Sequence, residues 1–509
     1  MLGILVVFLG IGLGVVLACP PLWRDYDGLI QISSRPNDMT LLQYPAAYPF
    51  FSRMHIYAAE VIRGWIDHHK TTIRLKRVVV LNDAGIRALM ISQEIILALA
   101  LTAFVWRGAQ SPAARWLMVA VLASNASIFV MANLISTEAL SVGLVIALVA
   151  IGIELFRAAK LSMAGVAAYG VCLYAAIMTR HLNALFAMLL PLAFLFRFVA
   201  EWLRARRVTA GLGSRLAVFV LVGMACIAGD QVTTRLLCRA FDVEYRGISA
   251  RATGERLGFV KLMPPPEQEA FLAHLQASTD DPVLKEAIPL LARPATWVQQ
   301  REEILQILER QTPATDPEAL KVKADAYLDR AASLFFHTHN RYLVQETLRS
   351  IWHCLAATSP TDVSSFYLQD ATWSIDLYAS HPEFGKKTNG LAVCSPEAKD
   401  RIVGFEANPW LRLWKWAPHG LVLAVSSALA LVFLLARVGD PAIPLFVLAI
   451  ALTALIATSL TFVLTNYAAR FTTVADICAF LTLSLAMAHW FDSRSGNVER
   501  SGSKRASKK

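Results

Sequence analysis

The chain has 509 residues, of which 56% are hydrophobic and 17% are charged, and its mean hydropathy is +0.49. Soluble domains carry about 25% charged residues, so this composition excludes a soluble globular protein and indicates an integral membrane protein. The net charge of +10 does not indicate a nucleic-acid partner, because Lys and Arg collect on the cytoplasmic loops of membrane proteins.

Apolar runs long enough to cross a bilayer, about 20 residues each, recur along the chain. Spans are expected at residues 2–19, 86–106, 116–134, 137–156, 162–179, 182–200, 216–236, 417–436, 441–465 and 471–491. We expect the first run to remain as a helix, because it lacks the basic start of a cleaved signal peptide. The sequence therefore predicts an all-α polytopic membrane protein with about ten transmembrane helices.

Basic residues fall in every second connection between these runs. They are Arg107, Arg115, Arg157, Lys160, Arg204, Arg206, Arg207, Arg215 and Arg437, followed by a basic tail at 492–509. Positively charged loops stay in the cytoplasm, so we expect both termini there. The short loops and the basic tail favour a bacterial inner membrane.

Two long segments fall on the opposite, periplasmic side. A membrane domain (1–236) contains a first periplasmic loop at 20–85. A mainly helical periplasmic domain (237–416) is inserted between spans seven and eight, before the C-terminal spans (417–491).

The two long segments differ in pattern. Residues 54–70 of the first loop have apolar residues at helical spacing and are predicted to lie along the membrane surface. In the inserted segment, one helix face is predicted to carry Trp297, Ile304, Leu305 and Leu308, and breaks are expected at 264–266 and 310–317. An oxidising periplasm would permit one disulfide among Cys238, Cys354 and Cys394, although the sequence does not select the pair.

The stretch "RDYDG" places Asp25 and Asp27 directly after the first span. Such residues can be solvated loop carboxylates or helix caps. In an extended segment they would share one face, and at that spacing each could raise the pKa of the other, as a general base requires. We favour Asp27 as the base, because Gly28 allows close backbone approach to a ligand, whereas Asp25 can pair with its neighbour Arg24.

Further polar residues are expected on the same side of the membrane. Glu138 lies near an external turn, where it is either functional or part of a helix start capped by Ser136 or Thr137. External arginines near span ends either extend to lipid headgroups or bind an anion such as phosphate. The arginine candidates are Arg180 and Arg470, and His181 follows Arg180 directly. Tyr48 and Arg53 are further candidates in the aromatic and proline-rich stretch of the first loop.

This arrangement resembles the polytopic C-type glycosyltransferases, which use polyprenyl-phosphate sugars. "RDYDG" stands where those enzymes carry a catalytic acidic residue after the first span. "YPAAYPFFSR" is similar to their "R-x-P-x-YP" stretch, and "AARFTTVADI" to their "RY-x-x-P" opening of a late span, with Phe471 for Tyr and no proline. The resemblance covers residues 1–236 and 417–491. Segment 237–416 has no counterpart, and in the family a soluble domain more often follows the last span.

The resemblance implies transfer of a sugar from a polyprenyl-phosphate donor to a periplasmic glycan, lipid or protein acceptor, with inversion. Asp27 or Asp25 would be the base, and Arg180, Arg470 and His181 would bind the donor phosphate. Glu138, Tyr48 and Arg53 would support them. The expected partners also include membrane lipids. No cofactor is expected, and a divalent metal ion is not indicated.

Three other classes remain open. An O-antigen polymerase or ligase also has many spans, a large periplasmic loop and paired external arginines, but would not need the first-loop aspartates. A transporter of lipid-linked substrates would place charges inside its spans and would not need about 180 external residues. A non-enzymatic scaffold is the third. Replacing the aspartates separates the transferase from the polymerase.

Overall fold

The structure is a computed structural model that describes residues 1–34, 45–68, 78–206, 211–242, 263–291, 297–312, 316–338, 340–464 and 472–506. It divides into two compact units. Unit 1 comprises Met1–Val243, Leu355–Ala457 and Thr472–Lys509, and unit 2 comprises Glu244–Cys354 and Thr458–Phe471. The sequence interpretation placed 237–416 in one external domain, whereas the packing assigns the part from Leu355 onward to unit 1.

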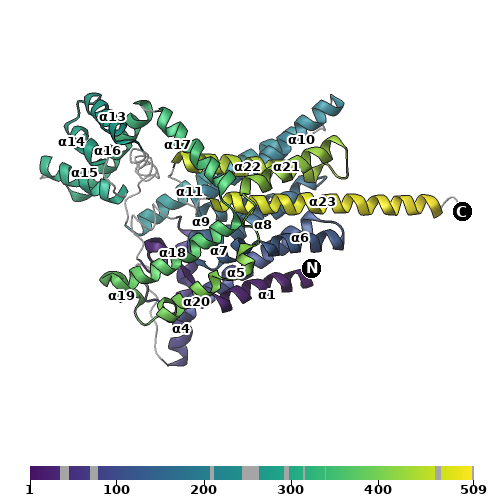
Figure 1. Ribbon diagram of the computed structural model, residues 1–509, viewed down its shortest axis with the longest axis horizontal. Helices are drawn as coiled ribbons and strands as arrows, with labels where there is room; N and C mark the ends of the chain where they lie inside the picture. Colours follow the sequence, from purple (N-terminus) through teal and green to yellow (C-terminus); the bar gives the residue numbers. More distant parts are fainter. Residues whose placement is uncertain are drawn as a thin grey trace. The chain divides into compact units, whose positions relative to one another are not determined.

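The described part of unit 1 consists of helices (Figure 1) and one pair of very short strands. Its first half contains α1 (Leu2–Ala18), β1 (Leu22–Trp23), α2 (Asp25–Ser33), α4 (Ala47–Ile66), α5 (Asp83–Gly108), α6 (Pro112–Ser124), α7 (Ala126–Ala132), β2 (Leu134–Ile135), α8 (Thr137–Arg157), α9 (Met163–Thr179), η1 (His181–Met188), α10 (Leu189–Ala205) and α11 (Leu212–Ala240).

The chain returns to unit 1 through η3 (His353–Ala357), which begins in unit 2. The following elements are α18 (Pro360–Ser380), α19 (Pro382–Thr388), η4 (Ala392–Cys394), α20 (Pro396–Glu406), η5 (Pro409–Arg412), α21 (His419–Leu435), α22 (Ala442–Leu464) and α23 (Thr473–Ala506). The last residues of α22 belong to unit 2.

Each expected apolar run coincides with one or two of these helices. Among the described residues, six helices are long and apolar enough to cross a membrane: Asp83–Gly108, Thr137–Arg157, His181–Arg204, Leu212–Ala240, Ala442–Phe462 and Thr473–Arg494. The pair α6 and α7 is a further candidate, bent by 66°, and α1, α9 and α21 are shorter apolar helices. The chain is therefore an all-helical membrane protein, and the total of ten spans remains a prediction.

The connections between the long helices meet at two opposite ends of unit 1. At one end, Arg157 pairs with Asp440 at 3.2 Å and Arg107 with Glu154 at 2.5 Å. These pairs join the α5–α6, α8–α9 and α21–α22 connections, which carry the basic residues. The α1–α2, α7–α8 and α9–η1 connections, together with the start of α23, therefore lie at the other end, as the alternation of charge predicts.

Unit 2 is a small helical domain with its own hydrophobic core. Its helices are α13 (Pro265–Ala277), α14 (Pro282–Leu291), α15 (Trp297–Gln311), α16 (Pro317–Thr338) and α17 (Asn340–Trp352). Ile304, Leu305 and Leu308 are all buried in this core, which confirms the predicted face at these three positions. The side chain of Trp297 lies outside the described residues. The helix boundaries at Pro265 and between Gln311 and Pro317 confirm both predicted breaks.

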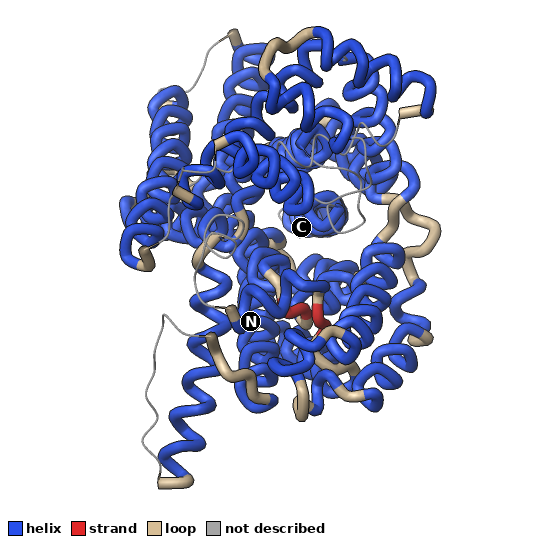
Figure 2. Tube along the Cα trace, turned by 90° about the vertical axis from the view of Figure 1, so that its left-hand side faces the viewer, coloured by secondary structure: helices blue, strands red, loops and turns tan. Residues whose placement is uncertain are grey.

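A two-residue parallel ladder joins segments far apart in the sequence (red in Figure 2). β1 pairs with β2 through Leu22 with Leu134 and Trp23 with Ile135. Gly28 packs directly on this ladder, because a Cβ at this position would lie 2.7 Å from the carbonyl oxygen of Ile135. The close approach expected at Gly28 is therefore made to the protein's own backbone.

Candidate functional site

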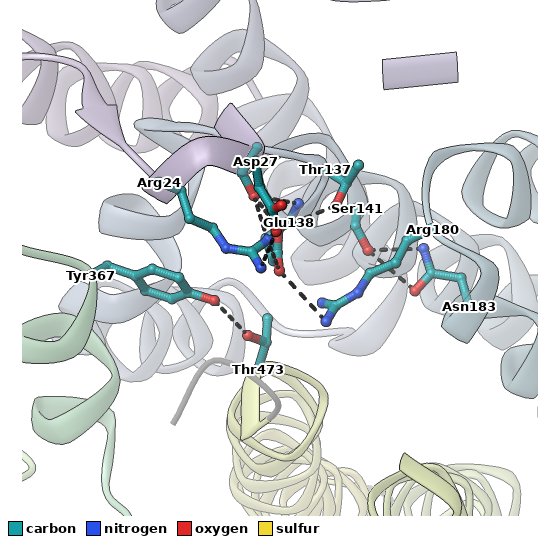
Figure 3. Close-up of polar contacts among 10 residues, drawn as sticks. Arg24, Asp27, Thr137, Glu138, Ser141, Arg180, Asn183, Tyr367 and Thr473 are labelled. Carbon is teal, nitrogen blue, oxygen red and sulfur yellow. Dashed lines mark hydrogen bonds and ion pairs between the residues drawn. The ribbon is translucent and has the colours of Figure 1, made fainter. Parts of the chain in front are cut away.

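Two guanidinium groups and two carboxylates converge beside the β1–β2 ladder (Figure 3). The ladder sets the residue after β1, Arg24, beside the start of α8. Arg24 Nη1 donates to both oxygens of Glu138 at 2.7 and 2.8 Å, and its Nη2 donates to Asp27 Oδ2 at 3.1 Å. Arg180 Nη2 approaches Glu138 Oε1 to 3.6 Å. Three connections at one end of the membrane helices thus contribute charge to one cluster.

The four side chains differ in burial. We call Arg24 and Glu138 the inner pair, and Asp27 and Arg180, which each contact one inner residue, the outer pair. The side chains of Arg24 and Glu138 are only 5% and 2% exposed, whereas those of Asp27 and Arg180 are 15% and 12% exposed. A buried ion pair needs further hydrogen bonds to offset the cost of leaving water. The carboxylate of Glu138 receives them from the hydroxyls of Ser136 and Thr137. Arg24 and Glu138 therefore hold Asp27 and Arg180 in place from the buried side, and Asp27 and Arg180 lie nearer the surface.

The two interpretations offered for Glu138 are compatible. The hydroxyl oxygen of Ser136 accepts a hydrogen bond from the backbone N–H of Glu138 at 3.3 Å and caps α8. Glu138 lies in the first turn of that helix, where the helix dipole favours a negative charge. The capped helix start thus orients the carboxylate toward both arginines.

Asn183 fixes the connection that carries Arg180. Its side-chain amide donates to the carbonyl of Ala176 and to the hydroxyl of Ser141, both at 2.8 Å. Ala176 and Asn183 lie on either side of the break between α9 and η1, and Ser141 belongs to the neighbouring helix α8. Arg180 therefore projects from an anchored segment (Figure 3).

Tyr367 of α18 extends the site toward α23. Its hydroxyl lies 3.1 Å from the hydroxyl of Thr473. Burial raises the pKa of Tyr367 to about 12, with a smaller contribution in the same direction from the charge of Glu138. The phenol of Tyr367 therefore stays protonated and uncharged beside the cluster at physiological pH.

Sequence analysis did not identify Arg24, Tyr367, Thr473 or Asn183 as site residues. The sequence does contain a signal for Arg24. This arginine follows the apolar pair Leu22 and Trp23 directly, and an arginine that is buried with such residues needs an acidic partner. Tyr367 lies in the middle of a helix, in a segment that was expected to belong to a separate domain. No local pattern marks it.

Asp25 and Asp27 were expected in an extended segment, but the structure places both in a helix. They begin α2, and residues two apart in a helix point about 200° away from each other. Asp27 pairs with Arg24, the residue that was expected to pair with Asp25. The side chain of Asp25 lies outside the described residues, as does Arg470.

His181, Tyr48 and Arg53, the other predicted site residues, make their contacts outside this charged cluster. His181 Nδ1 lies 3.4 Å from Asp230 Oδ2 of α11, so it faces a different acid from its neighbour Arg180. Tyr48 is buried in α4, with its hydroxyl 3.5 Å from the carbonyl oxygen of Leu134, and it supports the ladder. Arg53 is also buried in α4.

Burial lowers the pKa of Arg53 to about 10. Its Nε and Nη2 atoms have no hydrogen-bond partner within the described part of the chain. Arg53 is thus a buried cation with unused donors. Among the described residues, no group of three or more His, Cys, Asp or Glu side chains could hold a metal ion.

Comparisons with known proteins assign no family. No family model matches the chain, and no curated protein matches it. One similar solved structure is that of ArnT from Cupriavidus metallidurans bound to undecaprenyl phosphate. It is 12% identical, with 95% of this chain and 78% of that chain covered, at a TM-score of 0.22. A TM-score this low does not establish that the two proteins share a fold.

Proposed function

We propose that this membrane protein is a glycosyltransferase that moves a sugar from a polyprenyl-phosphate donor to an acceptor hydroxyl. The observation that carries the proposal is the outer pair, Asp27 and Arg180, held by the buried pair Arg24 and Glu138. A carboxylate beside a cation, at one end of membrane helices, suits a substrate that joins a lipid phosphate to a sugar. The sequence resemblance to C-type glycosyltransferases supports the same assignment.

Asp27 acts as the general base in this proposal. As the acceptor oxygen attacks the anomeric carbon, its proton passes to the carboxylate, and the bond between that carbon and the phosphate oxygen breaks. The configuration at the sugar inverts in this single displacement. Lipid phosphate leaves as an anion, so the site needs cations more than a strong acid.

Arg180 stabilises the departing phosphate. Its side chain is more exposed than that of Arg24, and it contacts Glu138, whose partner Arg24 holds Asp27. Arg470, which follows α22, is proposed as a second phosphate ligand, with His181 beside Arg180. Arg53 supplies a further buried cation on α4, the helix that supports the ladder.

An O-antigen polymerase or ligase is the second candidate, because paired arginines would also suit a lipid pyrophosphate. The Asp27→Asn and Asp25→Asn variants separate the two. The assay follows release of polyprenyl phosphate by the protein in vesicles supplied with polyprenyl-phosphate sugars and acceptor glycans or lipids. Loss of a general base costs about 10²–10⁴-fold in rate, so the variant lacking the base should lose most turnover and keep donor binding.

Asp67→Asn is the matched control, since Asp67 belongs to the same loop and its side chain is half exposed. It should retain full turnover. If both Asp27→Asn and Asp25→Asn turn over at the wild-type rate, neither aspartate is the base. That result would favour the polymerase or ligase.

A further inference from the structure

Helix α17 of unit 2 has an apolar stripe on its exposed side. Val344, Leu348 and Trp352 follow each other at intervals of four residues and so lie on one face of the helix. They are 52%, 60% and 70% exposed. By contrast, Thr347 and Ser350 of the same helix are only 7% and 6% exposed. The small polar residues thus face the protein, and three large apolar residues face outward.

This pattern is the reverse of that in the core of unit 2. On α15, Ile304, Leu305 and Leu308 are buried, and Gln306 and Glu309 are exposed. A helix in water shows the α15 pattern, so the outer face of α17 is suited to an apolar surrounding. Unit 2 has a continuous core without the stripe.

We propose that the stripe Val344, Leu348 and Trp352 lies in the interface of an anionic phospholipid bilayer. Chain continuity is the first argument. The apolar helix Ala442–Phe462 is a candidate membrane span, and its last residues, from Thr458, belong to unit 2. Leu460 in that last part is exposed, as a lipid-facing residue would be. Unit 2 therefore includes the end of a membrane span.

Charge and side-chain chemistry favour lipid over a protein surface. Arg341 and Arg349 on the same helix are exposed, and Arg349 is only loosely held by Glu346 at 3.6 Å. Basic residues near a membrane surface attract anionic headgroups, and Trp is enriched at the level of the headgroups. A helix with apolar residues on one face and arginines beside them lies in the plane of the interface. This inference does not depend on the transfer reaction.

Spin-label accessibility tests the proposal. A nitroxide is attached to cysteine at Val344, Leu348 or Trp352 in the full-length protein, in nanodiscs of phosphatidylcholine and phosphatidylglycerol. Protein without the added cysteine gives the background from native cysteines. Collision with oxygen, which concentrates in lipid, is compared with collision with a water-soluble nickel chelate. Gln306→Cys on α15 is the matched water-exposed control.

We expect high oxygen and low nickel accessibility at all three stripe positions, and the opposite at Gln306. The double variant Arg341→Glu/Arg349→Glu should lower the oxygen-to-nickel ratio at position 348 toward that of the control, whereas Lys323→Glu on α16 should leave it unchanged. High nickel accessibility along the stripe would place it in water. Low accessibility to both reagents would mean that protein covers it, from this chain or a second copy. Either result overturns the proposal.

Discussion

At the scale of single residues, Arg24 connects the acids of the site. It is buried and donates to Glu138 and Asp27, so its removal would leave the carboxylate of Glu138 without its closest cation. Breaking a buried ion pair by removing one partner costs about 3–5 kcal/mol. Replacing both partners by apolar residues of similar volume is close to neutral.

We therefore predict that Arg24→Met lowers the free energy of unfolding by about 3–5 kcal/mol. The double variant Arg24→Met/Glu138→Met should recover most of this loss. Denaturant unfolding in detergent measures both. Arg63→Met is the control, because its pair with Asp67 is exposed, and such pairs contribute at most about 1 kcal/mol. Equal effects of Arg24→Met and Arg63→Met would show that the buried pair is not a support.

Arg180 should act on the donor more than on protein stability. Arg180→Ala removes the proposed phosphate ligand, and the KM for donor should rise, with part of the loss recovered in Arg180→Lys, which keeps the charge. Arg197→Ala is the matched control at the opposite end of unit 1, where Arg197 pairs with Glu201. An unchanged KM in Arg180→Ala would remove Arg180 from the donor site.

Tyr367 gives a prediction about alkaline pH. Burial raises its pKa from the ordinary 10.0 to about 12, so the folded protein holds this proton more tightly than the unfolded chain. The resulting stabilisation is present below pH 10 and is lost as pH rises through 12. The difference in unfolding free energy between wild type and Tyr367→Phe should shrink over that interval. A difference that grows with pH would contradict the assignment.

At the scale of elements, the bend between α6 and α7 is held by a buried polar cluster. Asp476, in the first turn of α23, accepts hydrogen bonds from Ser127 and Asn125 at the bend, and His419 Nδ1 lies 3.4 Å away. The indole of Trp410 donates to the carbonyl of Ala123, at the end of α6, at 2.9 Å. These contacts explain why the run 116–134 forms two helices.

Asp476→Ala leaves the side-chain amide of Asn125 without its acceptor, whereas the hydroxyl of Ser127 keeps the side-chain oxygen of Asn125 as an acceptor. An unsatisfied buried polar group costs about 1–3 kcal/mol, and we expect a loss of that order in unfolding free energy. Turnover should fall as well, because α7 leads into β2 and Glu138. Asp400→Ala, at an exposed position of α20, is the control. If Asp476→Ala is as stable and active as that control, the cluster does not hold the bend.

Gly28 tests the role of the ladder. A Cβ there would meet the carbonyl oxygen of Ile135 at 2.7 Å, whereas a Cβ at Gly10 of α1 has nothing within 4 Å. We expect Gly28→Ala to destabilise the protein and reduce turnover by displacing Arg24 from Glu138. Gly10→Ala should be neutral or stabilising by about 0.5–1 kcal/mol, the helix preference for Ala. Comparable melting temperatures of the two variants would contradict this account of the ladder.

The elements could be predicted largely from the sequence, and the contacts of the site could not. Hydropathy is local, so each expected apolar run contains a helix, and the amphipathic face of α15 was found from its spacing. The ion pair of Arg24 and Glu138 joins residues 114 positions apart, through a ladder too short to leave a pattern. Asp25 and Asp27 were expected in an extended segment because a nine-residue helix such as α2 leaves only a weak apolar pattern.

At the scale of the whole molecule, the account requires the site and the basic connections to face opposite sides of the membrane. Single cysteines introduced at Asp67 and Gln306 should be labelled by an impermeant reagent from the periplasm, and a cysteine at Ser214 only from the cytoplasm. These positions test the first loop, unit 2 and the first turn of α11. Labelling of position 214 from outside would contradict the topology.

A cryo-electron microscopy map of the protein in nanodiscs with polyprenyl phosphate tests the proposed donor site most directly. We predict density for the phosphate within hydrogen-bond distance of the Arg180 guanidinium, on the side that carries Asp27. Phosphate density at the opposite end of unit 1, beside Arg157 and Arg215, with none near Arg180, would contradict it.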